Sequence, residues 1–336
     1  MPVAVVTGVT GQDGSYISEF LLEKGYIVFG VVRRSTYQIH SSNLSNVSLM
    51  NPNFKVVTGD LTDQPSLVNI LESAVKASKD GDEAIEIYNL AAQSHVGVSF
   101  ECPVSTIEMN TIGPLNVLES IRQLKIGHRV KFYQASTSEM FGKVQEIPQT
   151  EKTPFYPRSP YGVAKLGAHW LVKNYRESYG MFACSGILFN HESPRRGVHF
   201  VTQKIVKALA RDPPYVELGN LDAKRDWGHA ADYVRAMWLM LQQGYPDDYV
   251  VATGEQHSVR EFVELVAKRR GLTITWSGSG PGEIGVDQDN RIIVKVNPEF
   301  YRPCEVETLI GDSSKIRNIG WTPEYSFEGL VENMCT

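Results

Sequence analysis

The chain has 336 residues, 42% of them hydrophobic and 21% charged, which is enough apolar material for a large buried core in a globular protein. Its net charge of -5 argues against nucleic acid or an anionic membrane surface as the main partner. The four cysteines are far apart and form no CxxC pair, so we expect neither a disulfide framework nor a zinc knuckle, and we predict a reduced, cytoplasmic setting.

The first residues are apolar and run directly into a glycine-rich turn, without a cationic segment followed by a long apolar core. No apolar run approaches the length needed to cross a bilayer. We therefore expect neither a secretory signal nor a membrane partner.

Short apolar runs rich in β-branched residues are typical of strands buried on both faces, and they occupy 3–7, 27–33, 54–58, 85–90, 130–135 and 181–189. Helical patterns separate or follow them at 15–24, 65–77, 104–125 and 161–179. This alternation predicts an α/β fold with a doubly wound parallel sheet of the Rossmann type.

The pattern loosens after residue 190, around proline-rich and glycine-rich stretches. We expect a second, smaller lobe over the carboxyl edge of the sheet, where ligands bind in such folds. The predicted division assigns 1–190 with roughly 228–256 to the sheet domain, and 191–227 with roughly 257–336 to the smaller lobe, interleaved with it.

A glycine-rich turn joins the first predicted strand to the first helix. Glycines let the backbone approach a pyrophosphate, which the free N–H groups and the dipole of a helix N-terminus stabilise. The spacing is GxxGxxG, so a glycine-rich turn without a ligand is the alternative. Because the order strand, glycines, helix is right, we predict a dinucleotide cofactor held by Gly8, Thr10, Gly11, Gln12, Asp13 and Gly14.

The second predicted strand ends at Arg33 and Arg34. NAD-binding folds usually place an acid there for the ribose hydroxyls, whereas arginine suits a 2′-phosphate, so the pair favours NADP; two solvated arginines are the alternative. Asp60, followed by Leu61, comes after the third strand and could contact the adenine or serve as the N-cap of the next helix.

The fourth strand runs into Leu90, Ala91, Ala92, Gln93 and Ser94. Small residues there leave room for a flat cofactor, but they also serve close packing, and both interpretations stay open. Ser94 and the following His95 fall at the edge where a substrate should lie.

Tyr161 and Lys165 are four residues apart, which places them on one face of a helix. A nearby cation favours the phenolate, so we expect Tyr161 to act as a base and Lys165 also to hold the cofactor ribose. Thr137 would orient the substrate alcohol. Because YxxxK is common by chance, an amphipathic surface tyrosine is the alternative for Tyr161, and the glycine loop and Thr137 favour oxidation of a secondary alcohol.

Glu139 is a carboxylate that simple alcohol oxidation does not require. A new ketone acidifies the proton on its α-carbon, and a carboxylate placed there can remove it and help expel a β-hydroxyl as water. The stored hydride could then return to the resulting alkene, in a redox-neutral cycle. A helix-start or salt-bridge role is the structural alternative.

The segment from His191 to Gly197 does not match HExxH, and we expect no metal. Its adjacent arginines suit phosphate better. Further cations that could meet a diphosphate, or remain solvated, are Lys204, Arg225 and Arg302.

Several motifs carry a resemblance that runs over nearly the whole chain. They are GVTGQDGSY (8–16), YNLAAQSHV (88–96), QASTSE (134–139), PFYPRSPY (154–161), NYRESYG (174–180), LFNHESPRRG (188–197), RDWGH (225–229) and RPCEVET (302–308). With them the chain resembles the extended short-chain dehydrogenase/reductases and, within these, the GDP-mannose 4,6-dehydratases. The glycine loop and YxxxK are shared by the whole superfamily, whereas FNHESPRRG and RDWGH are specific to this branch.

The resemblance implies oxidation of GDP-D-mannose at C4, loss of water across C5 and C6, and hydride return to C6. Tyr161 would be the C4-hydroxyl base, Thr137 its hydrogen-bonding partner and Glu139 the C5 acid/base. Nucleotide-sugar contacts are implied for Asn190, Lys204, Arg225 and Arg302, with Glu305 nearby, and cofactor contacts for His191 and Arg196. Ser94 is predicted as a substrate contact from its place at the end of the fourth strand. Arg33 and Arg34 resemble subunit-bridging arginines, which implies a homodimer or homotetramer.

Three mild departures from the family pattern are Gly167 and His169, which stand where tyrosines are usual, and Cys304, which replaces a small residue. A 4-epimerase or 4-keto reductase using the same tyrosine and lysine is the nearest rival. A second activity, reduction of the 4-keto product with external NADPH, stays open beside dehydration. A non-catalytic NADP-sensing scaffold is a rival of another class.

Overall fold

The computed structural model describes residues 1–34, 43–47, 51–78, 84–301, 304 and 306–336. Its centre is a seven-stranded sheet in which every neighbouring pair is parallel, in the order β11-β6-β5-β4-β1-β2-β3. The strands are β1 (Val3–Thr7), β2 (Ile27–Val32), β3 (Phe54–Thr58), β4 (Ile85–Asn89), β5 (Val130–Thr137), β6 (Phe182–Leu188) and β11 (Asp248–Val251). The predicted doubly wound parallel sheet is thus confirmed.

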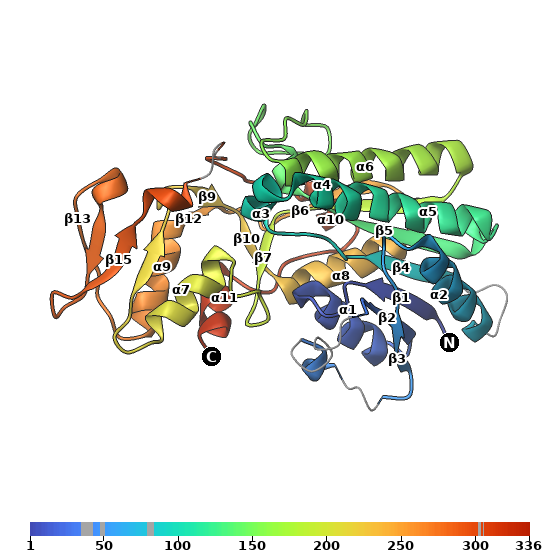
Figure 1. Cartoon of the computed structure of the whole chain (residues 1–336), viewed down its shortest axis with the longest axis horizontal. Coiled ribbons are helices and arrows are strands. Elements are labelled where there is room, and N and C mark those ends of the chain that lie inside the picture. Colours follow the sequence, from blue (N-terminus) through green and yellow to red (C-terminus); the bar gives the residue numbers. More distant parts are fainter. Residues whose placement is uncertain (35–42, 48–50, 79–83, 302–303, 305) are drawn as a thin grey trace.

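Helices cover both faces of this sheet (Figure 1). α1 (Gln12–Glu23) and α8 (Ala230–Leu241) pack on one face, and α2 (Gln64–Ala77), α5 (Gly113–Gln123) and α6 (Pro160–Tyr179) pack on the other. Alternate residues of each strand enter the two cores, so both faces of the central strands are buried. This explains why β1 and β2 appear in the sequence as largely apolar runs, whereas β4 and β5 also carry buried polar side chains such as Glu86 and Gln134.

The helix expected at 104–125 is interrupted. α3 (Val96–Glu101) and α4 (Pro103–Ile107) lead into a π-helical turn, η2 (Glu108–Ile112), before α5 begins. Asn110 is buried in this turn and exchanges two hydrogen bonds of 2.8 Å with the backbone of Gln93. The wider turn therefore holds the segment after β4 in place, as π-turns often do beside functional sites.

A second core lies beyond the carboxyl edge of the sheet. It contains α7 (Val201–Leu209), α9 (Val259–Arg269), α11 (Phe327–Cys335) and a sheet in the order β13 (Thr275–Ser277), β14 (Ile284–Val286), β15 (Ile292–Val296) and β8 (Val216–Leu218). Two short ladders, β7 (Asn190–Glu192) with β10 (Trp227–His229) and β9 (Lys224–Arg225) with β12 (His257–Ser258), complete the strands. The remaining short elements are η1 (Asn43–Asn46), η3 (Gly127–Arg129), η4 (Ser138–Met140), η5 (Gly280–Gly282), η6 (Pro298–Phe300) and α10 (Ser314–Arg317).

The division of the chain at 190, 227 and 256 stays a prediction. Ile316 and Trp321, which that division assigns to the smaller lobe, pack in the core between α1, α8 and the main sheet. The C-terminal segment therefore contacts both cores. Within the described part of the chain, no helix has the length and apolar character required to cross a membrane.

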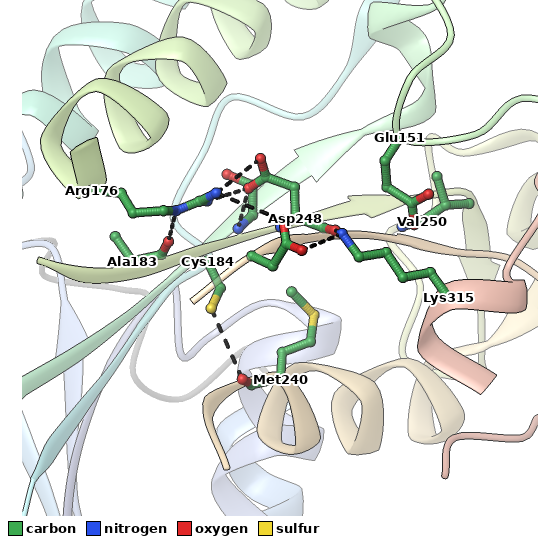
Figure 2. A network of polar contacts seen from close by, with 10 residues as sticks. Glu151, Arg176, Ala183, Cys184, Met240, Asp248, Val250 and Lys315 are labelled. Carbon is green, nitrogen blue, oxygen red and sulfur yellow. Dashed lines mark hydrogen bonds and ion pairs between the residues drawn. The ribbon is translucent and has the colours of Figure 1, made fainter. Parts of the chain in front are cut away.

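The edge strand β11 is fixed by a network of polar contacts (Figure 2). Arg176 of α6 pairs with Asp248 and donates to the Ala183 carbonyl at 2.7 Å. Lys315 donates to the Asp248 carbonyl at 2.8 Å, and the Val250 N–H donates to a Glu151 carboxylate oxygen at 2.7 Å. Because Glu151 satisfies an outward N–H of the edge strand, this edge offers less backbone for pairing with another chain.

Candidate active site

A cavity of about 800 Å³ lies where the carboxyl ends of the central strands face the second core. Several segments that are far apart in the sequence meet there. The predicted site residues that line it are Asp13, Leu90, Ala92, Ser94, Thr137, Glu139, Tyr161, Lys165, Asn190, His191, Arg196, Lys204 and Arg225.

Tyr161 is held in the first turn of α6. The helix begins at Pro160, and Ser159 caps it by accepting the Gly162 N–H at 3.0 Å. One turn later, the Lys165 ammonium donates to the Ala135 carbonyl at 3.1 Å and lies 5.9 Å from the Tyr161 ring centroid. Both side chains are buried.

Burial decides the protonation of this pair. It raises the pKa of Tyr161 to about 12, although a hydrogen bond with Thr137 lowers it. It also lowers the pKa of Lys165 to about 8. Burial of the charge is the largest cause in both groups, and the role of Tyr161 as a base stays a prediction.

Glu139 lies just beyond the end of β5, in the short helix η4. Its N–H donates to Thr137 Oγ1 at 3.2 Å, which turns the chain away from the strand. A Cβ atom on residue 162 would lie 2.8 Å from the Glu139 carbonyl oxygen, so only glycine lets the start of α6 approach this closely. Glu139 is buried and lines the same cavity as Tyr161 and Thr137.

The glycine-rich turn lies beside the segment that follows β4. Gly8 has a φ of +68°, and a Cβ atom there would lie 2.8 Å from the Ala91 nitrogen. Thr7 Oγ1 accepts the N–H groups of Leu90 and Ala91 at 3.0 and 3.1 Å. α1 then begins with Gly11 at its N-cap and no side-chain cap. Small residues and an uncapped helix start thus form a cradle that fits the pyrophosphate of a dinucleotide.

Asp13 and His191 connect the glycine-rich turn to β7. His191 Nε2 lies 2.8 Å from Asp13 Oδ2, and Nδ1 lies 2.8 Å from the Phe189 carbonyl oxygen. Since both neighbours are acceptors, the imidazolium satisfies both. Burial alone would lower the pKa of His191 and raise that of Asp13, but the pair raises the former and lowers the latter.

Stability should therefore depend on this pair within a pH window. The pair begins to stabilise the fold as the pH rises and the Asp13 carboxyl ionises. Its stabilisation is complete below the unfolded histidine pKa of about 6.5, and it is lost as the pH rises through the higher pKa of His191 in the folded state. We expect His191→Gln to lower the free energy of unfolding by about 1–3 kcal/mol near pH 6 and by less at pH 9. Denaturant unfolding at both pH values checks this.

The surface histidine substitution His128→Gln is the control, and we expect it to change stability by less than about 0.5 kcal/mol at either pH. A loss for His191→Gln that is the same at pH 6 and pH 9 would show that the pair contributes packing and not charge.

Cations and aromatic rings form the wall that belongs to the second core. Lys204 Nζ lies 3.7 Å from the Phe300 ring centroid, and burial lowers its pKa. Arg225 is buried and donates to the Lys224 carbonyl at 2.9 Å. Arg196 pairs with Glu192 at 3.1 Å. This wall suits an anionic ligand such as a diphosphate.

Other predicted residues lie away from the cavity. Arg33 and Arg34 are exposed at the end of β2, and Leu61 is packed in the core. Asp60 is not an N-cap, because α2 begins at Gln64 behind Asp63. Instead its carboxylate accepts the Thr62 N–H at 2.9 Å and the Thr62 hydroxyl at 2.8 Å.

Of the remaining predicted site residues, Gln93 is held by its hydrogen bonds with Asn110 of η2. The turn and the first helical residues beside the cavity contain Thr10, Gly11, Gln12 and Gly14. Arg302 and Glu305 lie outside the described residues. Sequence reasoning missed the cavity residues His199, Phe300 and Tyr301, for which no spacing gives a signal. Among the described residues, no group of three His, Cys, Asp or Glu side chains could hold a metal ion.

The chain is similar to known proteins over nearly its whole length. The family model described as GDP-mannose 4,6 dehydratase matches residues 5–334. The GDP-mannose 4,6 dehydratases of Drosophila melanogaster and Homo sapiens are 52% and 51% identical, over 99% of this chain and 85% and 90% of theirs.

Solved structures share the fold. The UDP-glucose 4-epimerase of Thermus thermophilus, a complex with NAD, has a TM-score of 0.80 at 26% identity, over 99% of this chain and 97% of that one. DesIV, the dTDP-glucose 4,6-dehydratase of Streptomyces venezuelae, has a TM-score of 0.80 at 24% identity, over 99% and 95%. Because an epimerase and a dehydratase fit equally well, the fold alone does not choose between these reactions.

Proposed function

Because the chain belongs to the GDP-mannose 4,6-dehydratase family, we propose that it converts GDP-D-mannose to GDP-4-dehydro-6-deoxy-D-mannose. The observation that carries this proposal is one cavity lined by the buried side chains of Tyr161, Thr137 and Glu139. Oxidation at C4 needs the first two, and elimination across C5 and C6 needs an additional carboxylate.

Each residue has a distinct role in the proposed reaction. Tyr161 takes the C4 hydroxyl proton while Thr137 orients that hydroxyl. A bound nicotinamide supplies the hydride acceptor at C4 and the hydride donor at C6. Glu139 removes the C5 proton, which the new C4 ketone acidifies, and then protonates the departing C6 hydroxyl. Return of the hydride to C6 leaves an enolate that takes up a proton at C5, and Tyr161 gives up the proton it took from the C4 hydroxyl. C4 is thereby oxidised, C6 is reduced and one water is lost.

Lys165 and the glycine-rich turn would hold the cofactor, with the uncapped start of α1 facing its pyrophosphate. The presence of NAD in the related epimerase supports a nicotinamide dinucleotide at this position. The cations Lys204 and Arg225, with Arg196, would face the negative charges of the nucleotide-sugar and cofactor.

We further propose that the cofactor is NADP, because Arg33 and Arg34 stand at the end of β2, where a 2′-phosphate would lie. Replacing both by alanine should weaken NADPH binding about 10- to 100-fold and NADH binding less than threefold, since only NADPH carries that phosphate. Fluorescence titration measures both. The control is Arg122→Ala, a surface arginine paired with Glu119. Equal affinity of the wild type for the two cofactors would overturn this preference.

The proposed assembly is a homodimer, a state in which two copies bury the same surface. α4, η2 and α6 carry exposed apolar side chains: Val104 is 70% exposed, Trp170 51% and Val163 50%. α4 and α6 pack against each other, and exposed apolar side chains on such a pair of helices support an interaction surface here. The proposed location of the protein is the cytosol, which the free thiols at all four cysteines support.

A charge on this face should separate the subunits. We expect Trp170→Glu to reduce the mass measured by light scattering from about twice 37.5 kDa to about 37.5 kDa, because dimerisation would bury a carboxylate. Tyr245→Glu, at an exposed aromatic residue beyond α8, should leave the mass unchanged. A wild type that is monomeric at micromolar concentration would contradict the dimer.

The direct test of function is to incubate the protein with GDP-D-mannose and catalytic NADP, without added reductant. We expect a 4-keto-6-deoxy sugar nucleotide. Mass spectrometry should show a product about 18 Da lighter than the substrate, because each turnover releases one water. An epimerase would instead give a product of unchanged mass. A 4-keto reductase would act only after NADPH is added, and that second activity is measured in the same assay.

A further inference from the structure

β1 and β4 end in buried polar side chains, and β5 carries a third in register with them. Thr7 on β1 pairs with Asn89 on β4, and Asn89 pairs with Gln134 on β5. At 2%, 0% and 1% exposure these are as buried as the apolar core beside them. Two residues earlier, the same strands carry Val5, Ile87 and Phe132 in the core under α2 and α5. Toward the active-site cavity, the apolar side chains of these strands are therefore followed by one hydroxyl and two amides.

These side chains form one chain of hydrogen bonds. The Thr7 hydroxyl donates to Asn89 Oδ1 at 2.7 Å, and Asn89 Nδ2 donates to Gln134 Oε1 at 2.9 Å. Gln134 Nε2 then donates to the Ala135 carbonyl at 3.1 Å. The same Thr7 hydroxyl accepts the N–H groups of Leu90 and Ala91, so the chain starts beside the glycine-rich turn.

The chain ends at the acceptor of Lys165. The Ala135 carbonyl takes one hydrogen bond from Gln134 Nε2 and one from Lys165 Nζ, each 3.1 Å long. A carbonyl oxygen has two lone pairs, and here both are used. Buried polar groups are costly when left unpaired, so this arrangement fixes the Ala135 carbonyl, and with it the ammonium, in one position.

We propose that Gln134 is a positioning residue for Lys165, which acts by holding the Ala135 carbonyl that anchors the lysine. This inference rests on the proposed function, in which Lys165 binds the cofactor. An apolar side chain at 134 would leave Asn89 Nδ2 without its acceptor and Ala135 with a single donor. The lysine would then move over a wider range, and cofactor affinity and turnover would fall while GDP-mannose binding stayed the same.

Gln134→Met tests this, because methionine keeps the length of the side chain without its amide. We expect kcat to fall about tenfold, the Kd for NADPH to rise about fivefold and the KM for GDP-mannose to stay within twofold. The matched control is Gln149→Met, at another fully buried glutamine, which bonds Glu146 and Ile310 outside the site. Gln149→Met should lower the Tm but leave the Kd for NADPH within twofold.

A double-mutant cycle separates positioning from a general loss of stability. With Lys165→Met already present, adding Gln134→Met should change the Kd for NADPH by less than twofold, because its effect passes through the lysine. A further fivefold loss in that background would overturn the inference. So would Gln134→Met with wild-type kcat and Kd.

If Gln134→Met does not fold, Gln134→Glu keeps the shape and still accepts from Asn89. Its carboxylate favours the charged lysine, so the pH at which NADPH affinity declines should rise by at least half a unit; an unchanged profile would overturn the inference. A wild type that neither binds NADPH nor converts GDP-mannose would overturn the proposed function together with this inference. A fully active wild type beside an unaffected Gln134→Met would overturn the inference alone.

Discussion

Glu139→Gln is expected to lower kcat for dehydration roughly 10²- to 10⁴-fold while changing the KM for GDP-mannose less than about threefold. Glutamine has nearly the same shape as glutamate and keeps the backbone contact with Thr137, but it cannot accept the C5 proton. Oxidation at C4 does not require this carboxylate, so a fraction of the cofactor should remain reduced when substrate is added. Absorbance at 340 nm and mass spectrometry of the products measure the two steps separately.

The control for this substitution is Glu101→Gln, a second carboxylate that lines the cavity but lies on α3, away from the end of β5. We expect its turnover to stay within a few-fold of the wild type. Unchanged dehydration by Glu139→Gln would contradict the proposed role of this residue and would favour the epimerase or reductase interpretation, in which no elimination occurs.

Tyr161→Phe has the other large expected effect, a fall in kcat of roughly 10³-fold or more. The phenylalanine fills the same buried space, so the fold should be kept, but the oxygen that takes the C4 proton is lost. Lys165 does not replace this oxygen, because its ammonium donates to the Ala135 carbonyl at 3.1 Å.

Tyr156→Phe is the matched control, at a half-exposed tyrosine on the loop before α6, and it should leave turnover unchanged. Steady-state kinetics on both variants, with circular dichroism as a check of folding, give the comparison. Unchanged turnover in Tyr161→Phe would contradict the proposed role of Tyr161 as the base, and a wild type without any turnover would be the result expected of a non-catalytic, cofactor-sensing scaffold.

The parallel sheet could be predicted from the sequence because most of its strands are short, largely apolar runs that alternate with helical patterns. The position of the site followed from that prediction, since the glycine-rich turn, Thr137 and Glu139 all come after predicted strands. What could not be predicted depends on contacts between distant residues. The π-helical turn at 108–112 needs Asn110 to bond Gln93, and the protonation of His191 needs Asp13, which is 178 residues away.

The sequence also does not reveal how deeply each side chain is buried. The spacing of Tyr161 and Lys165 correctly places both on one helix face, but it does not show that burial is the largest cause of the pKa shift of each group. Asp60 shows the same limit locally, because its carboxylate turns back on Thr62 instead of capping α2.

The central claim is that one sugar carbon gives up a hydride and another carbon of the same sugar receives it. We would mix GDP-mannose deuterated at C4 with GDP-mannose whose hexose carries ¹³C, add the protein and analyse the products by mass spectrometry and NMR. The account predicts deuterium in the C6 methyl group of the ¹²C product and none in the ¹³C product. Deuterium that remains at C4, exchanges into water or appears in the ¹³C product would contradict it.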